Sequence, residues 1–389
     1  MNLPAMKTLD RALGPFLCGL VRAGYALAPP RPGPAELKRI LVIKFWGMGG
    51  LILSAPLLQS LRASFPSAEI HLATLAQNHE VAEWLGLADR LHLLELSPSP
   101  VRTARQIFRF LEQVRAVRAD AALDLEYLTR FSALVAGYSR APLRAGFAAP
   151  GVWRGDLHNL PVAFRSDLHV SQNFLQLAAA LGAKPAEPAP SPARPDRKEG
   201  EELLRDHGIA ADERVIVVNP NAGELALERR WPAEHFIALL NRILQADLGR
   251  VVLIGAPDEQ DFVRRLQQSL SSPDQVIVLA GKLNFRQLAG LLARANLLIT
   301  NDSGPLHLAA LLHTPTLSFF GPETPILYGP TGPEHTALYA HLPCSPCIHI
   351  ETAKTVRCLH PRPECLYTIT PDQAWTAIQS CLQSRQSRQ

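Results

Sequence analysis

The sequence has no apolar run of the roughly 20 residues that a membrane-spanning helix needs, so no transmembrane segment is expected. Only 19% of the 389 residues are charged, and the formal net charge is +4. This charge is scattered, and no basic stretch is interleaved with aromatic residues, which excludes a nucleic-acid-binding protein. The 47% of hydrophobic residues indicate a soluble globular chain, and its length is sufficient for two domains.

The first 38 residues form an N-terminal, membrane-proximal amphipathic segment. Its apolar stretch, residues 12–21, is flanked by Arg11 and Arg22. Three interpretations stay open: a helix lying on anionic lipid, a soluble helix packed on the protein body, and a secretory signal. Glycine and proline interrupt the stretch and argue against the signal.

Apolar strands and amphipathic helical stretches then alternate in two blocks, residues 39–184 and 199–370, separated by a Pro-rich linker at 185–198. A helix and tail at 371–389 follow. Such alternation predicts parallel βαβ units in two Rossmann-like, doubly wound α/β domains, whose ligands bind in the cleft where the domains face each other. Expected strands are 39–44, 70–74, 90–96, 121–125, 214–219, 250–255, 276–280 and 297–301. Expected helices are 51–64, 77–85, 103–117, 232–245, 259–269, 285–294 and 372–382.

The segment 297–311 is the most informative part of the chain, because an apolar strand runs into a small polar turn that opens an apolar helix. The first amides of a helix lack partners within it and carry partial positive charge, so they bind anions. Asp302 or Ser303 can cap the helix, and Gly304 allows close approach of a ligand. An ordinary capped turn is the competing interpretation.

Two further loops at predicted strand ends complete a candidate site for a nucleotide diphosphate. Asn219 opens the first loop, and Arg229 follows it with the charge to contact phosphate. Asp258 and Glu259 follow the next strand, where a carboxylate can bind a ribose diol. Alternatively, the arginine is a solvated surface charge, the carboxylates only favour a helix start, and His307 is a core histidine.

Four of the six cysteines lie close together in the sequence: Cys344, Cys347, Cys358 and Cys365, within a Cys-rich segment at 344–365 that also contains His349 and His360. Four thiols that begin with a C-x-x-C fit a structural zinc site. Paired or redox-active thiols and unliganded cysteines remain the alternatives.

These motifs together resemble the inverting family 9 glycosyltransferases, which include the ADP-heptose:lipopolysaccharide heptosyltransferases. In the first block, ILVIKFWGMGG at 40–50 and PLLQSLR at 56–62 carry the resemblance. In the second it rests on NPNAG at 219–223, RWPAEHF at 230–236, LAGK at 279–282, TNDSGPLH at 300–307 and FGP at 320–322. The resemblance implies a GT-B fold, an acceptor domain first, a nucleotide-sugar domain second, and no cofactor or metal required for catalysis. It also implies that the last helix returns to the first domain.

Carried onto this sequence, the resemblance implies a set of residues that bind the donor, with ADP-heptose as the implied donor. Arg229 stands where the family has a phosphate-binding lysine, and Asp258 or Glu259 falls near its ribose-binding acid. The implied set is Asn219, Arg229, Asp258, Glu259, Lys282, Asp302, Ser303, Gly304, Leu306 and His307.

The acceptor side departs from the family. The aspartate that serves as base in the first glycine turn is replaced by Gly50, which cannot take a proton. Glu126, at the end of a predicted strand, is the first candidate for the base, and Asp124 is the second. Alternatively, Asp124 caps the next segment and Glu126 is solvated. Lys44 either holds acceptor anions or lies along the strand edge.

The sequence thus predicts a cytoplasmic glycosyltransferase on the inner face of a bacterial membrane, moving heptose to a lipid-linked saccharide such as lipopolysaccharide core. A nucleotide-sugar-binding scaffold or regulator without turnover is the second hypothesis, motivated by Gly50. A nicotinamide-dependent oxidoreductase is the third, and it is disfavoured because the turn at 47–50 is not G-x-G-x-x-G.

Overall fold

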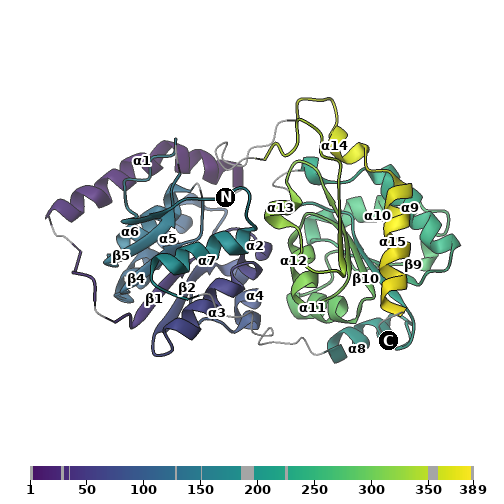
Figure 1. Ribbon diagram of the computed structural model, residues 1–389, viewed down its shortest axis with the longest axis horizontal. Helices are drawn as coiled ribbons and strands as arrows, with labels where there is room; N and C mark the ends of the chain where they lie inside the picture. Colours follow the sequence, from purple (N-terminus) through teal and green to yellow (C-terminus); the bar gives the residue numbers. More distant parts are fainter. Residues whose placement is uncertain are drawn as a thin grey trace. The chain divides into compact units, whose positions relative to one another are not determined.

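The computed structural model describes residues 3–27, 30–34, 36–127, 129–149, 151–184, 197–223, 227–348 and 358–386. The chain divides into two compact units, residues 1–193 and 194–389, and each is described by itself (Figure 1). Most of the predicted linker, residues 185–196, lies outside the described residues. Arg197 already begins the first helix of the second unit.

The first unit is built on a six-stranded parallel sheet with the order β3-β2-β1-β4-β5-β6. Its strands are β1 (Arg39–Ile43), β2 (Glu69–Leu75), β3 (Arg90–Leu94), β4 (Ala121–Asp124), β5 (Leu143–Phe147) and β6 (Leu160–Val162). Its helices are α1 (Leu3–Leu27), α2 (Met48–Ile52), α3 (Ala55–Ser64), η1 (Ala76–Asn78), α4 (His79–Leu85), α5 (Pro100–Ala116), α6 (Arg130–Tyr138) and α7 (Val170–Ala180). Helix α3 packs beside α7, and α6 packs beside α5 and α1.

The second unit repeats this plan with the order β12-β11-β10-β7-β8-β9, again all parallel. Its strands are β7 (Val215–Asn219), β8 (Arg250–Leu253), β9 (Val276–Val278), β10 (Leu297–Asn301), β11 (Thr316–Phe320) and β12 (His335–Tyr339). Its helices are α8 (Arg197–Asp206), η2 (Leu227–Arg229), α9 (Ala233–Gln245), η3 (Pro257–Glu259), α10 (Gln260–Gln268), η4 (Pro273–Gln275), α11 (Phe285–Arg294), α12 (Gly304–Leu311), α13 (Pro325–Tyr328), α14 (Glu364–Tyr367) and α15 (Pro371–Gln386).

Counted from the first strand of each unit, both sheets have the order 3-2-1-4-5-6. The order reverses between β1 and β4 in one sheet and between β7 and β10 in the other. Ligands of such sheets bind beyond the carboxyl ends of the strands at this reversal. The candidate residues of both units therefore belong at these two places.

Most predicted elements are present. Helix 285–294 and strand 297–301 match α11 and β10 to the residue. The expected helix 51–64 is instead two helices, since α2 ends at Ile52, a turn covers Leu53 and Ser54, and α3 begins at Ala55. Four elements between residues 130 and 180 were not predicted, since β5 (LRAGF) and β6 (LPV) show little of the β-branched pattern of a buried strand.

The position of the last helix differs from the expectation that it returns to the first domain. Helix α15 belongs to the second unit, where Ala374 and Ile378 are fully buried in the same core as Trp231 and Phe319. The Trp231 ring stacks on Phe319 at 4.0 Å, and its Nε1 donates to the carbonyl of Ile369 just before α15. The expected return of this helix to the first domain is therefore wrong, because its apolar side completes the core of the second unit.

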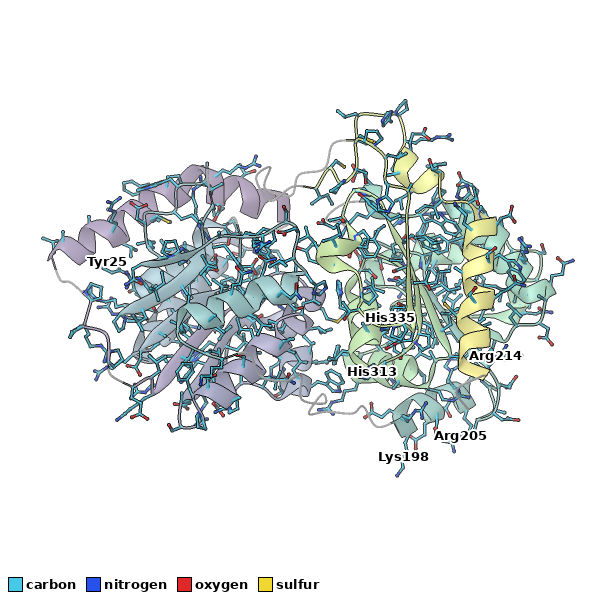
Figure 2. The ribbon with its side chains drawn as sticks, in the orientation of Figure 1. Tyr25, Lys198, Arg205, Arg214, His313 and His335 are labelled. Atoms are coloured by element: carbon cyan, nitrogen blue, oxygen red, sulfur yellow. The ribbon has the colours of Figure 1, made fainter. Side chains whose placement is uncertain are left out.

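Helix α1 packs on α6 of the first unit. Cys18 is buried against Leu134 and Leu157, and the Asp10 carboxylate accepts hydrogen bonds from the first main-chain amides of α6. Tyr25 projects from α1 toward the body of the unit, where its hydroxyl donates to Gly137 O at 2.5 Å (Figure 2). A bilayer crossing demands more length and apolar character than any of the described helices has.

Candidate functional site

The turn that joins β10 to α12 keeps the start of the helix open. Ser303 is extended and makes no capping hydrogen bond through its side chain. Its hydroxyl lies 2.9 Å from Thr300 Oγ1 and accepts from Asn219 Nδ2 at 3.1 Å. The first hydrogen bond of the turn runs from Leu306 N to Ser303 O. Amides that precede it, such as that of Gly304, keep their capacity to bind an anion.

Arg229 lies against this turn. Its NH1 is 3.0 Å from Asp302 Oδ2, and its NH2 donates to Ala222 O at 2.9 Å. The third donor, Nε, is buried without a hydrogen-bond partner among the described residues. His307 Nε2 lies 3.9 Å from the other oxygen of Asp302. A guanidinium with an unpaired donor beside an open helix start is a site for an anionic group such as phosphate.

Asparagines tie the loop after β7 to the end of β10. Asn219 Nδ2 also lies 3.3 Å from Thr300 Oγ1, and Asn221 Nδ2 donates to Asn219 Oδ1 at 3.2 Å. Asn301 donates to Asn221 O and accepts from Trp231 N. Asn221, Thr300 and Asn301 were not singled out from the sequence, although they lie in the strings NPNAG and TNDSGPLH. They fix two neighbouring strand ends as one rigid surface.

The remaining predicted donor residues lie further along the sheet. Asp258 and Glu259 follow β8, two strands from β10, which is about 10 Å at the usual strand spacing. Glu259 accepts a hydrogen bond from Ala256 N at 2.8 Å and so supports a helix start, as the competing interpretation held. Asp258 is exposed. Lys282 is exposed after β9, a third strand away from β10.

Arg230 is not a solvated charge. Its guanidinium lies 3.9 Å from the centre of the Phe262 ring. Burial lowers the pKa of Arg230, and the nearby Glu259 carboxylate partly offsets this. The two consecutive arginines therefore have different roles: Arg229 faces the helix start, and Arg230 packs on α10.

In the first unit, Glu126 holds the glycine turn after β1. Its Oε1 lies 2.7 Å from Lys44 Nζ and accepts from the main-chain amides of Phe45 and Trp46 at 2.8 and 3.0 Å. Both charged residues are only 5% exposed, so the interpretations of Glu126 as solvated and Lys44 as lying along a strand edge are wrong. A Cβ added at Gly50 would lie 2.7 Å from Lys44 Cε. The lysine therefore fills the space beside the position of the family's aspartate.

Asp124 is fully buried at the end of β4 and does more than cap. Its Oδ1 accepts from Glu126 N at 3.0 Å, and its Oδ2 accepts from Ser132 Oγ at 2.9 Å. The same Oδ2 lies 3.1 Å from His158 Nε2 and 3.5 Å from Arg154 NH1. Neither His158 nor Arg154 could be singled out from the sequence, because no element was predicted around them.

The four clustered cysteines meet around one small cavity. Cys344, Cys347, Cys358 and Cys365 all line it, together with His360, whose Nε2 is 3.7 Å from Cys344 Sγ. All four are free, and burial raises the pKa of Cys365 to about 11. Among the described residues, no three or more ligating side chains are arranged to hold a metal ion. His349 lies outside the described residues.

Comparisons with known proteins agree with these motifs. A family profile, glycosyltransferase family 9 (heptosyltransferase), matches residues 107–356. Lipopolysaccharide heptosyltransferase 1 of Escherichia coli is 22% identical over 304 residues, covering 76% of this chain and 91% of that protein. Lipopolysaccharide heptosyltransferase 2 of Salmonella typhimurium is 25% identical over 304 residues, covering 74% of this chain and 84% of that protein.

Solved structures give the same fold. The structure of E. coli ADP-heptose LPS heptosyltransferase II has a TM-score of 0.70 and 20% identity, and the match covers 90% of this chain and 99% of that one. The E. coli heptosyltransferase WaaC with ADP-2-deoxy-2-fluoro heptose has a TM-score of 0.63 and 20% identity, covering 88% and 99% of the two chains. The fold is therefore GT-B, and the protein belongs to glycosyltransferase family 9.

Proposed function

We propose that the protein transfers heptose from ADP-heptose to a lipid-linked saccharide such as lipopolysaccharide core, with inversion at the anomeric carbon. Membership of family 9 and the heptosyltransferase relatives support the sugar and the class of acceptor. The observation that carries the proposal is Arg229 at the open start of α12, held there by Asp302. The proposed donor-binding residues are those implied by the resemblance, from Asn219 to His307.

The proposed reaction is a single displacement. An acceptor hydroxyl oxygen forms a bond to the anomeric carbon, and the bond from that carbon to the β-phosphate oxygen breaks on the opposite side. The electron pair leaves with ADP, whose growing negative charge is stabilised by Arg229 and the amides at the start of α12. With these donors fixed in place, catalysis requires no metal ion.

A nucleotide screen tests the donor. ADP, GDP, UDP and dTDP are each added to the full chain, and the melting temperature is recorded, because a ligand of the native state raises it. We expect the largest rise with ADP, and we expect ADP-heptose to release ADP as heptose is transferred to heptose-deficient lipopolysaccharide. A preference for another nucleotide, or no transfer, contradicts the proposal.

A scaffold that binds the nucleotide sugar without turnover is the second candidate function. Gly50 favours it, since the base of the family is absent and Lys44 occupies the adjoining space. This function predicts tight ADP binding with neither hydrolysis nor transfer of the donor. The transfer assay above separates the two.

We also propose that α1 binds the cytoplasmic face of an anionic membrane, where the lipid-linked acceptor would be reached. Exposed apolar side chains follow one another at helical spacing along α1: Leu9, Leu13, Phe16, Leu20 and Leu27. Arg11 and Arg22 are exposed on other sides of α1, and Arg22 pairs with Asp156 of the same unit. Cys18 is buried, so opposite sides of one helix serve the protein and the lipid.

Vesicle flotation tests this contact. The protein is expected to float with vesicles containing phosphatidylglycerol and less with pure phosphatidylcholine. The double variant F16E/L20E should stay at the bottom, whereas V101E, which alters an exposed valine on α5, should float like wild type. Flotation of F16E/L20E at the wild-type level contradicts the proposal.

A further inference from the structure

A second cavity lies in the first unit, at the carboxyl end of β5. It has a volume of about 460 Å³, which is within the range of small-molecule sites. Its lining includes Phe147, Trp153, Arg154, Asp156 and His158. Trp153 is 46% exposed and offers an aromatic face, whereas the Arg154 guanidinium is buried and donates to the carbonyls of Glu126 and Phe147. An exposed aromatic face among polar side chains suits a saccharide.

The cavity adjoins the reversal point of the sheet. Asp124 ends β4, and His158 reaches it from the segment between β5 and β6. Gly146 in β5 makes this approach possible, because a Cβ there would lie 2.5 to 2.7 Å from three atoms of the His158 ring. A glycine inside a strand commonly marks such a close approach. The sequence thus provides a place for the imidazole against the sheet.

The hydrogen bond to Asp124 determines which ring nitrogen of His158 carries the hydrogen. Oδ2 of the buried aspartate is an acceptor, so His158 Nε2 carries the hydrogen across their 3.1 Å separation. The ring then has its lone pair on Nδ1, which is the state that a general base needs. Ser132 Oγ and Arg154 NH1 lie at 2.9 and 3.5 Å from the same oxygen and hold the carboxylate in position.

Glu126 is less suited to the same task. Its Oε1 already receives Lys44 Nζ and two main-chain amides. Taking a proton would weaken this set of bonds and leave the buried lysine with a neutral partner. Asp124 contributes differently, since it can stay ionised while the histidine beside it gains charge.

The segment that lines the cavity also packs on α1. Cys18 approaches Gly155, the Trp153 ring lies 3.6 Å from a Cβ placed at Gly19, and Arg22 pairs with Asp156. The cavity is therefore attached to the side of α1 opposite the apolar face that we propose to lie on the membrane. This arrangement is appropriate for the saccharide of an acceptor whose lipid stays in the bilayer.

We infer that this cavity binds the saccharide of the acceptor and that His158, oriented by Asp124, is the general base that replaces the aspartate missing at Gly50. The inference rests on the proposed transfer function. The acceptor hydroxyl gives its proton to His158 Nδ1 as its oxygen bonds to the anomeric carbon. ADP leaves with the electron pair of the broken bond, and the imidazolium, stabilised by Asp124, later returns the proton to water.

The test compares wild type with H158Q and H158A, using ADP-heptose and heptose-deficient lipopolysaccharide. Glutamine can still donate to Asp124, so H158Q should keep its melting temperature and its affinity for ADP within about twofold. Its kcat should fall by roughly 10²–10⁴-fold, the usual contribution of a general base. Added imidazole should raise the transfer rate of H158A at least tenfold. No such increase is expected if His158 has only a structural role. H79Q, on the exposed His79 of α4, is the matched control and should behave as wild type.

A kcat of H158Q within threefold of wild type overturns the inference, and so does failure of imidazole to increase the rate of folded H158A. Either result leaves transfer by the wild-type protein intact. If the wild type itself transfers no sugar, the proposed function fails instead, so the two failures are distinguishable.

Discussion

The two sheets have the same strand order, but the polar groups at the point where this order reverses have opposite roles in the two units. In the first unit, amides of Phe45 and Trp46 and the Lys44 ammonium could together bind an anion, yet the Glu126 carboxylate of the same chain occupies them. In the second unit, the Ser303 side chain does not cap the start of α12, and Arg229 Nε is buried with no hydrogen-bond partner in the part of the chain that the structure describes. The donors after β1 are thus occupied by a carboxylate of the chain, whereas the start of α12 stays open, although Asp302 holds Arg229 beside it. We therefore assign the nucleotide to the second unit.

Removing the cation from the open site should have the largest effect. We expect R229A to lower kcat by about 100- to 1000-fold, as for loss of one group that stabilises developing charge. R229K should lose less, because it keeps the charge but not the forked geometry. Steady-state transfer assays measure this, with R264A on the exposed face of α10 as control. Equal activity of R229A and R264A would contradict the assignment of the phosphate site to the second unit.

Breaking the internal pair of the first unit should affect stability instead. K44M leaves Glu126 buried without its cation, which typically costs about 3–5 kcal/mol. The double variant K44M/E126Q should recover much of this loss, since no buried charge remains. Hydrogen exchange of peptides from β1 and β4 reports the opening free energy of this unit alone. A loss below about 1 kcal/mol in K44M, on the scale of an exposed ion pair, would show that the pair does not hold the turn.

The thiol cluster lies in the second unit alone. Its four thiols line one cavity, although no three or more ligating side chains among the described residues are arranged to hold a metal ion. We propose that zinc binds there and stabilises only the second unit. Purified protein should contain one zinc per chain, and C358S should lose it together with several degrees of melting temperature. C381S changes a cysteine outside the cavity and should keep the metal. Metal analysis that finds no zinc in the wild type, prepared without chelator, contradicts this proposal.

The smallest expected effect is a loss of stability of the first unit in acid. Burial, aided by the neighbouring His71, lowers the pKa of His92 from 6.5 to about 4. The unfolded chain therefore binds this proton at higher pH than the folded one, and the free energy of unfolding falls as the pH drops from 6.5 toward 4. H92Q should lose less stability over this range, whereas H79Q, at an exposed position, should follow wild type. If the free energy of unfolding depends on pH in the same way in H92Q and wild type, His92 is not the source of the acid sensitivity.

Local sequence patterns were sufficient to predict the elements that depend mainly on neighbouring residues. The strand, turn and helix at 297–311 follow from a continuous apolar run, a small polar turn and a proline, and the structure places β10 and α12 there. Arg229 and Asp302 come together because both follow strands that are neighbours in the sheet.

What the sequence could not provide are pairings between distant residues with no local signal. His158 lies 34 positions from Asp124, in a segment whose short strands contain Arg144, Gly146 and Pro161. Lys44 and Glu126 are 82 positions apart, and neither pattern nor spacing indicates that they form a buried pair. The return of α15 was wrong for a related reason: a family habit does not specify which core an apolar helix face completes.

We propose that the nucleotide binds where β10 turns into α12. Hydrogen exchange of the full chain, measured peptide by peptide with and without saturating ADP, tests this placement. We expect slower exchange in peptides covering residues 300–307 and 227–231, and little change in those covering 40–50. Protection confined to residues 40–50, with none at 300–307, would contradict it.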